Sequence, residues 1–490
     1  MSHQYLLALD IGTSSVRAAL YDGNAEPLPR AFAKIERVLA ATADGGSEID
    51  ADEAFAQVVA AIETVLDKTK NLKGEIEFVA SCSLMHSLVG IDAKGKPTTK
   101  VFGWADTRSG KFTDVLRKRF DEAVMHDRTG TRFHSSFWPA KLLWQRKEFP
   151  DVFAKTAKWL AFSDYVALKL FGYATTSISM ASGTGIFDIR KCNWDDELLK
   201  FLKLSPANLP AISDSDSATF RLNRTFAKRW PRLANARWFP SIADGVADNI
   251  GAGCVTRSKA ALMVGTSGAM RVAYAGEPPA KIPDGLWCYR VDRKRVLLGG
   301  ALSDGGRLYR WLKDNLKLPN DAEAEISRRG AATHGLTFLP FLAGERGTGY
   351  HESATGTILG LQSSNDAIDI LQAAMESVAY RFAEVFDQLN SAVKIKEIVA
   401  SGGALRESPV WTQIIADVLG HDLTISGSHE SSSRGAVLLA LESIGKIETT
   451  EVSPSSIVNK TAFHPKCHAI YNRVRTQHRK HYDLILDTKS

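Results

Sequence analysis

Cysteine is scarce in this chain and follows no metal-binding spacing. Only five cysteines occur among the 490 residues, scattered at Cys82, Cys192, Cys254, Cys288 and Cys467 with no Cys-x-x-Cys pair. This pattern excludes a disulfide framework of the secreted type and a zinc site built from paired cysteines. It is typical of a reduced, intracellular protein.

Long apolar runs and blocks of like charge are also missing. No stretch reaches the roughly 18 apolar residues that a membrane-spanning helix needs, and no secretory hydrophobic segment precedes the first predicted strand. We therefore expect a soluble, cytoplasmic protein without a membrane partner. The net charge of +6 is spread along the chain, which favours anionic small molecules slightly but does not indicate nucleic acid.

The length and the hydrophobic periodicity predict an α/β protein of more than one domain. A single core rarely extends beyond about 250–300 residues, so a chain of this length is expected to divide. A helical period over 51–68 alternates with strands at 78–83 and 88–92, and further strands and helices follow.

A polar, basic and proline-containing stretch over 210–240 precedes the domain junction, which we place near 245–258. The α/β pattern weakens there and resumes at Trp238. We therefore predict an N-terminal domain over 1–250, a C-terminal domain over 251–448, and a helical tail over 449–490 that returns over the surface.

A short hairpin motif occurs twice, about half the chain apart. In each copy an apolar strand leads into a Gly-Thr-Ser turn and then into a second apolar strand, and the two turns are Gly12-Thr13-Ser14 and Gly265-Thr266-Ser267. Such a turn presents backbone N–H groups and hydroxyls to an anion without steric hindrance. Two of them facing each other would hold a polyphosphate from both sides. Only the first copy has a carboxylate before the turn, Asp10, where a phosphate-bound Mg²⁺ would lie.

Two later stretches resemble a family signature. The C-terminal signature of the FGGY family of carbohydrate kinases is similar throughout to Gly356–Leu361 and, after seven further residues, to Asp369–Glu376. The N-terminal signature is matched in part, at 141–144, whereas Trp138 and Gln145 depart from it. The resemblance covers nearly the whole chain. It implies two ribonuclease-H-like domains of the actin and Hsp70 type, with ATP bound in the cleft between them.

Several segments look more like the gluconate kinases of this family than like its xylulose kinases. They are Met85-His86-Ser87, Trp104-Ala105-Asp106-Thr107-Arg108-Ser109, the run from Arg128 to His134, and Ala243-Asp244-Gly245-Val246. Xylulose kinases more often show Met-His-Gly and Gly-Asp-Asn. The resemblance therefore implies ATP-dependent phosphorylation of a sugar-acid hydroxyl, gluconate to 6-phosphogluconate.

The resemblance also implies a general base for the acceptor hydroxyl. The family places its catalytic aspartate seven residues before a glycine, and Asp244 with Gly251 keeps that spacing. Asp248, in Asp248-Asn249, is the alternative. It lies one helical turn further on and would point away from a substrate at the start of the helix. For either residue, a role as a helix cap is the structural alternative.

The nucleotide is expected to contact both hairpins and two further glycine pairs. Asp10 would hold Mg²⁺, mostly through water. The expected ATP contacts are Thr13, Ser14, Gly265, Thr266, Gly305, Gly306, Gly402, Gly403 and Ala404. Gly305-Gly306 would offer a helix N-terminus to a phosphate or ribose, although a simple capping turn explains it equally well. Gly402-Gly403-Ala404 would let adenine approach the backbone closely.

The sugar is expected to meet two segments that combine polar and apolar side chains. The candidates are Met85, His86, Trp104, Asp106 and Arg108. For His86 a purely structural role is the alternative, and for Arg108 the alternative is an ion pair that braces Asp106. A sugar acid also needs a cation for its carboxylate. The sequence leaves four candidates open for that role: Arg108, Arg132, His134 and Lys141.

Two rival functions remain open at this stage. One is a kinase for xylulose or another ketose or polyol. The other is a binding protein that responds to sugar or nucleotide without turnover, against which the presence of both Asp10 and Asp244 argues. Whether the protein forms a homodimer is left open.

Overall fold

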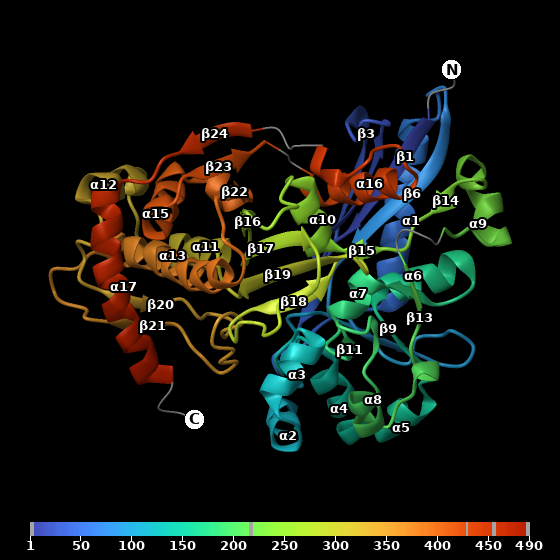
Figure 1. The fold of residues 1–490 in the computed structure, drawn as a ribbon, viewed down its shortest axis with the longest axis horizontal. Helices are drawn as coiled ribbons and strands as arrows, with labels where there is room; N and C mark the ends of the chain where they lie inside the picture. The colour runs from blue at the N-terminus through green and yellow to red at the C-terminus, as the bar shows by residue number, and fades with distance from the viewer. Residues whose placement is uncertain (1–3, 215–218, 428–429, 453–456, 487–490) are drawn as a thin grey trace.

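Two twisted β-sheets, each flanked by helices, form the two halves of the molecule (Figure 1). The computed structural model describes residues 4–214, 219–427, 430–452 and 457–486. Helix α10 (Asp244–Gly251) lies between the two sheets in the picture. The predicted α/β class is thus confirmed.

The first sheet holds the first Gly-Thr-Ser turn between two buried strands. Its strand order is β3-β2-β1-β6-β14, and β15 also pairs with β6. β1 is antiparallel to β2 and parallel to β6. The strands are β1 (Gln4–Ile11), β2 (Ser15–Tyr21), β3 (Pro27–Glu36), β6 (Glu75–Ser83), β14 (Arg237–Trp238) and β15 (Ile242–Ala243).

The second sheet repeats this arrangement around the second turn. Its order is β18-β19-β17-β16-β22-β23-β24, with β16 antiparallel to β17 and parallel to β22. The repeated hairpin is therefore part of a repeated sheet motif. The strands are β16 (Lys259–Val264), β17 (Gly268–Ala275), β18 (Trp287–Arg290), β19 (Arg295–Leu302), β22 (Glu397–Ser401), β23 (Leu423–Ser426) and β24 (Ile457–Thr461).

Helix α1 (Ala51–Lys68) covers β2 and β3 and matches the predicted helix over 51–68. Its start is fixed by Asp50, whose side chain accepts hydrogen bonds from the backbone N–H groups of Asp52 and Glu53. Its apolar residues recur at helical spacing and are buried, including Val58 and Ile62.

The remaining elements complete the two halves. A largely helical segment after β6 extends below the first sheet in Figure 1. The other helices are α2 (Lys111–Arg119), α3 (Glu122–Thr129), α4 (Trp138–Glu148), α5 (Pro150–Lys155), α6 (Phe162–Phe171), α7 (Ile178–Ser182), α8 (Asp196–Leu202), α9 (Arg224–Arg229), α11 (Gly306–Asn315), α12 (Ala322–Arg329), α13 (Ala367–Ala392), α14 (Gly403–Glu407), α15 (Pro409–Leu419), α16 (Ser431–Ser443) and α17 (Pro465–Leu486). The short strands are β4 (Ala40–Ala41), β5 (Ser47–Ile49), β7 (Val89–Ile91), β8 (Val101–Phe102), β9 (Lys158–Leu160), β10 (Thr175–Ser177), β11 (Phe187–Asp188), β12 (Asn193–Trp194), β13 (Ala211–Ser213), β20 (Thr337–Leu339) and β21 (Thr357–Leu359).

Helices α10 and α16 cross in backbone contact. A Cβ atom added at Gly251 would lie 1.8 Å from the carbonyl oxygen of Ser431, and one at Gly435 would lie 1.8 Å from that of Ala247. Glycine is therefore required on both helices. Although α16 is late in the chain, it also packs on β1 and β6, so it ties the C-terminal half to the first sheet (Figure 1).

The tail after residue 448 contains a strand as well as a helix. β24 pairs antiparallel with β23 at the edge of the second sheet, where its β-branched residues favour a strand. α17 then runs along the outside of the C-terminal half (Figure 1). The predicted helical tail is thus only partly helical, and positions 453–456 and 487–490 of it lie outside the described residues.

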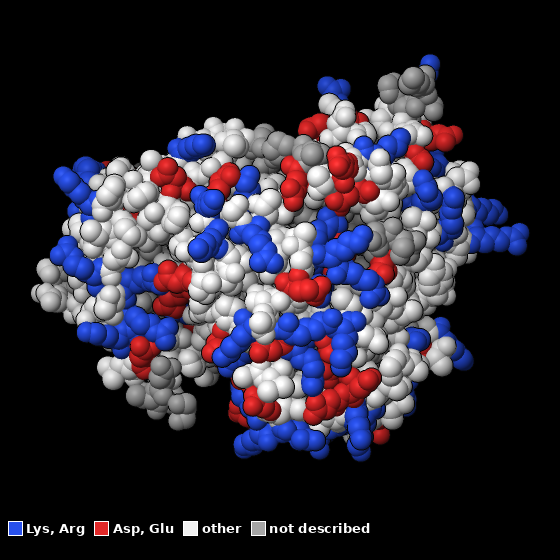
Figure 2. Space-filling model, in the orientation of Figure 1, with Lys and Arg blue, Asp and Glu red and all other residues white. Residues whose placement is uncertain are grey.

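The surface shows no block of like charge on the face seen in Figure 2, where basic and acidic side chains are interspersed. This agrees with the spread of charge along the sequence. All five cysteines are free. Within the described ranges, no helix combines the length and the apolar character that crossing a bilayer would require.

The helix crossing predicts a steric effect of a single methyl group. Gly435→Ala should destabilise the protein by about 1–3 kcal/mol, because the backbones of α10 and α16 must separate. Urea unfolding followed by circular dichroism would measure the change. Gly23→Ala is the matched control, because an added Cβ there meets nothing within 4 Å. Equal stability of the two variants would contradict the prediction.

Candidate active site

A cavity of about 350 Å³ lies between the two halves. Residues of both hairpins line it, together with Met85 and His86 from the loop after β6, the start of α10, and β18. Seven of the residues singled out in the sequence come together here: Thr13, Ser14, Met85, His86, Trp104, Asp244 and Thr266.

The second hairpin rests on the N-terminus of α11. The backbone N–H of Gly306 donates to the carbonyl of Gly265 at 2.7 Å, and those of Gly305 and Arg307 donate to the carbonyl of Thr266 at 3.2 and 3.0 Å. These N–H groups therefore hold the turn in place. The glycines permit this approach, since a Cβ at Gly306 would lie 2.6 Å from the carbonyl oxygen of Gly265.

The glycines after β22 lie beside this turn. Gly402 has a φ of +105° and packs so closely on β16 that a Cβ would lie 2.2 Å from the carbonyl oxygen of Val264. A Cβ at Gly306 would lie 3.3 Å from that of Ala404. Gly403 has open space where its side chain would be. The three glycine segments of the C-terminal half thus form one surface.

Asp244 places a carboxylate at the edge of the cavity. It is the first residue of α10, and its Oδ1 accepts the backbone N–H of Gly245 at 2.7 Å. Burial, followed by the nearby charge of Asp10, raises the pKa of Asp244 to about 7. The alternative, Asp248, forms an ion pair with Arg271 at 3.1 Å. Asp244 is therefore the better placed of the two to accept a proton near neutral pH.

Asp10 ends the first strand before the Gly-Thr-Ser turn and is buried. Its Oδ2 accepts from Arg17 at 3.3 Å, and the Cys82 thiol lies 3.5 Å from its Oδ1. Burial raises the pKa of Asp10, partly offset by Arg17, and the charge of Asp248 raises it further. A divalent cation would relieve this concentration of negative charge, and carboxylate oxygen is a ligand that Mg²⁺ accepts. The residues present therefore fit the expected ion.

His86 faces the cavity in one defined tautomer. It adopts a φ of +64°, and its Nδ1 lies 2.5 Å from the carbonyl oxygen of Gly183. A carbonyl can only accept, so Nδ1 carries the proton and Nε2 is left as an acceptor. Burial lowers the pKa of His86 well below its usual value, with Arg346 adding to the effect. A neutral histidine of this kind can accept a hydrogen bond from a sugar hydroxyl through Nε2.

Asp106 and Arg108 serve the fold and not the cavity surface. Arg108 donates to Asp106 and to Glu48 and lies over the rings of Phe102 and Trp144. Asp106 is only 1% exposed. Neither residue lines the cavity, although the sequence suggested both as sugar contacts. The alternative given for Arg108, an ion pair that braces Asp106, is the one observed.

The other proposed carboxylate ligands are also engaged. Arg132 pairs with Glu122 at 2.9 Å. Lys141 is fully buried, and burial lowers its pKa to about 7; its Nζ donates to the carbonyls of His86, Gly103 and Ser136 at 2.7–3.0 Å. It thereby fixes the two chain segments that carry His86 and Trp104.

His134 is held in its neutral form. Burial, followed by the charge of Arg346, lowers its pKa to about 3. Its Nδ1 accepts the backbone N–H of Ser136 at 3.0 Å. A neutral ring bonded in this way is a poor partner for a carboxylate, so none of the four cations named from the sequence stands free at the cavity.

Several cavity residues had no motif to mark them. Arg346 and Arg307 line it, as do Trp287 and Tyr289, whose rings stack 4.2 Å apart. The aromatic pair provides an apolar wall of the kind that sugar rings and chains pack against. Arg307 is the first residue after the Gly305-Gly306 pair, and its position at a helix start was the one available sequence signal.

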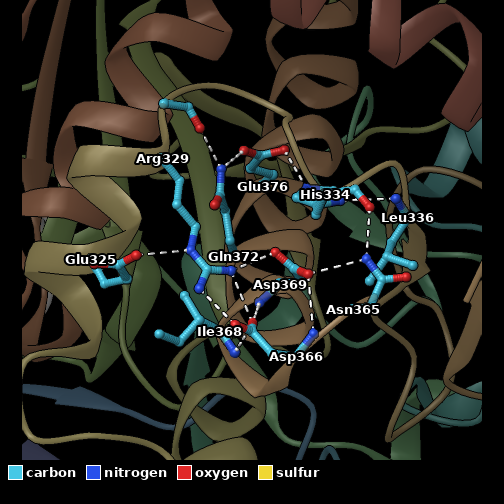
Figure 3. A network of polar contacts seen from close by, with 11 residues as sticks. Glu325, Arg329, His334, Leu336, Asn365, Asp366, Ile368, Asp369, Gln372 and Glu376 are labelled. Carbon is cyan, nitrogen blue, oxygen red and sulfur yellow. Dashed lines mark hydrogen bonds and ion pairs between the residues drawn. The ribbon is translucent and has the colours of Figure 1, made fainter. Parts of the chain in front are cut away.

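The C-terminal signature takes part in a polar network at the start of α13 (Figure 3). Glu376 is fully buried and accepts hydrogen bonds from His334, Gln372, Tyr380, Tyr471 and the backbone N–H of Ala332. Arg329 pairs with Glu325, Asp366 and Asp369. The specific residues of this stretch therefore fix α13 against its neighbours and do not touch the cavity.

Comparison with known proteins places the chain in a family. Two family models match, described as the N-terminal and C-terminal domains of the FGGY family of carbohydrate kinases, over residues 5–245 and 260–443. A gluconokinase of Bacillus licheniformis is 27% identical over 477 residues, which cover 94% of this chain and 92% of the relative.

Solved structures agree with this match. A gluconate kinase from Lactobacillus acidophilus superposes with a TM-score of 0.91 at 25% identity, over 100% of both chains. A xylulose kinase from the same organism gives 0.91 at 26% identity, over 99% of this chain and 100% of the other. The fold is thus that of a sugar kinase, a class of enzyme that transfers a phosphoryl group from ATP to a sugar. The chain belongs to the FGGY family of carbohydrate kinases.

The raised pKa of Asp244 predicts a carboxyl group that titrates near pH 7 in the free protein. The carboxyl should be protonated below that pH and ionised above it. Infrared difference spectra of the wild type minus Asp244→Asn would measure it; the subtraction is needed because burial also raises the pKa of Asp164 to about 7. Asp10→Asn should lower the titration point, because it removes a nearby negative charge. Titration near pH 4 in the wild type would contradict the prediction.

Proposed function

We propose that this enzyme phosphorylates a sugar acid, gluconate to 6-phosphogluconate, with Asp244 as the general base. The observation that carries the proposal is a carboxylate with a pKa of about 7 at the edge of a cavity that both Gly-Thr hairpins line. A base of that pKa accepts the proton of the acceptor hydroxyl efficiently near neutral pH.

The two hairpins hold the phosphates of ATP from opposite sides. Thr13 and Ser14 approach from the first sheet, and Gly265-Thr266 approaches from the second. Arg307 adds a cation on the second side, where its Nε lies 3.9 Å from the Asp304 carboxylate. Phosphoryl transfer depends mainly on such positioning and charge stabilisation. The surface formed by Gly305, Gly306 and Gly402–Ala404 receives the nucleoside.

Asp10 would hold Mg²⁺, mostly through water. When bound, the ion neutralises phosphate charge during the transfer. The site for the ion is preorganised, since Arg17 and the Cys82 thiol orient the Asp10 carboxylate. Asp10 also keeps the pKa of Asp244 high in the absence of ligand.

The acceptor lies against Met85, His86, Trp104 and the stacked pair of Trp287 and Tyr289. His86 accepts a hydrogen bond from a sugar hydroxyl through Nε2. A sugar acid is favoured over a neutral sugar because arginine side chains, Arg346 among them, line the cavity, and similarity to a gluconokinase over nearly the whole chain supports this choice.

A ketose kinase is the second candidate. The xylulose kinase from Lactobacillus acidophilus superposes as well as the gluconate kinase does. A binding protein without turnover is disfavoured, because a base whose pKa is raised to neutrality has no use in binding alone.

Substrate choice is tested by rates with pure enzyme. Coupled measurement of ADP release with gluconate, other aldonates, xylulose and glycerol should give the highest kcat/KM with gluconate. The physical reason is the charge-assisted contact that only the sugar acids can make. A higher kcat/KM for xylulose or another neutral acceptor would overturn the choice of gluconate and leave the kinase assignment intact.

The role of Asp244 is tested by two matched amide variants. Asp244→Asn should lower kcat by roughly 10²–10⁴-fold, because an amide cannot accept the hydroxyl proton. ATP binding, measured by calorimetry, should be retained. Asp248→Asn should cost much less, since Asp248 is engaged with Arg271. The reverse order of the two losses would show that Asp248 is the base.

A further inference from the structure

Arg346 is the one cavity-lining arginine for which the described residues supply neither an ion pair nor a side-chain hydrogen bond. It is only partly exposed, and burial lowers its pKa. The other cations around the cavity are engaged: Arg108 with Asp106, Arg132 with Glu122, Arg271 with Asp248, Arg307 loosely with Asp304, and Lys141 with three carbonyls.

Aromatic rings and tyrosine hydroxyls are the main groups around Arg346. Its guanidinium lies 5.0 Å from the centre of the Trp104 ring. The hydroxyls of Tyr289 and Tyr350 are buried without a hydrogen-bond partner among the described residues, and both tyrosines act electrostatically on Arg346. The charge of Asp244 also acts on Arg346, yet the two form no ion pair among the described residues. A largely desolvated cation without an ion pair, together with unsatisfied hydroxyls, is costly unless a ligand completes the set.

The loop that carries Arg346 is held rigidly. Glu345, the preceding residue, pairs with the buried Arg381 of α13 and accepts from the Tyr482 hydroxyl of α17 at 2.6 Å. The backbone N–H of Gly347 donates to Ala301 of β19 at 2.8 Å. The guanidinium is thus placed before any ligand arrives, which lowers the entropic cost of binding.

We propose that Arg346 binds the carboxylate of the acceptor and thereby selects sugar acids over neutral sugars; this inference rests on the proposed function. In an aldonate the carboxylate and the terminal hydroxyl lie at opposite ends of the carbon chain. Arg346 therefore holds one end while Asp244 meets the other. The tyrosine hydroxyls of Tyr289 and Tyr350 supply further donors beside the guanidinium.

Arg346 also joins the two halves through the acceptor. It comes from the C-terminal half, whereas Trp104 and His86 come from the N-terminal half. A sugar acid bound between them contacts both halves at once. Binding of the acceptor alone would then favour the arrangement that the phosphates also require.

The test removes the charge from the protein and from the ligand separately. Calorimetry without ATP compares gluconate with D-glucitol, in which CH₂OH replaces the carboxylate. The wild type should bind gluconate more tightly by about tenfold to hundredfold, the effect of one charge-assisted hydrogen bond. Arg346→Gln should remove most of that difference, and Arg346→Lys should keep part of it, because lysine retains the charge but not the planar fork.

Arg132→Gln is the matched control, because it removes an arginine that is already paired with Glu122. It should keep the preference for gluconate. Thermal unfolding of each variant checks the fold, and the comparison of the two ligands on the wild type needs no variant at all. ATP affinity should be unchanged in Arg346→Gln.

Three outcomes would overturn the proposal, and they are distinguishable. If Arg346→Gln keeps the wild-type preference for gluconate, the inference fails while the proposed function stands. If it lowers kcat with every acceptor but leaves gluconate affinity unchanged, Arg346 serves the phosphoryl group instead. If the wild type itself binds D-glucitol as well as gluconate and turns over a neutral sugar, the proposed function fails and the inference with it.

Discussion

The crossing of α10 and α16 is the contact on which the rest of the structure depends. Gly251 and Gly435 let the two helices meet backbone to backbone. α10 starts at Asp244, directly after a strand of the first sheet, and leads into β16 of the second. α16 returns from the second half to pack on β1 and β6. The position of the base relative to both hairpins is therefore set by how closely two helices can approach.

The acidic residues in and beside the cavity differ in their partners. Asp10 and Asp248 each have an arginine partner, Arg17 and Arg271. Among the described residues Asp244 has a backbone N–H as its hydrogen-bond donor and no ion pair, and its carboxyl is partly exposed with a raised pKa. The acid that is left without a cation is thus the acid suited to take a proton. Arg346 is likewise a cavity-lining arginine that has no ion pair among the described residues.

Local patterns allowed much of the fold and half of the site to be predicted. The hairpins and the helix over 51–68 depend on neighbouring residues, and the sequence spacing alone indicates them. The charged candidates could not be sorted in this way. Arg108 finds its partner two residues away, but Lys141 reaches carbonyls from three separate segments, which no spacing reveals. Arg346 comes from a loop without a motif and acquires its place only through tertiary packing.

The Tyr482 hydroxyl of the last long helix holds Glu345, the residue next to Arg346, so under our proposal this helix has an indirect part in the selection of the acceptor. α17 does not contribute to the cavity lining, yet it anchors, together with Arg381, the loop that carries Arg346. Relatives that diverge in this helix can thus acquire different acceptors while every residue in contact with the sugar stays the same. Residues that determine specificity in such enzymes can therefore lie outside the binding surface.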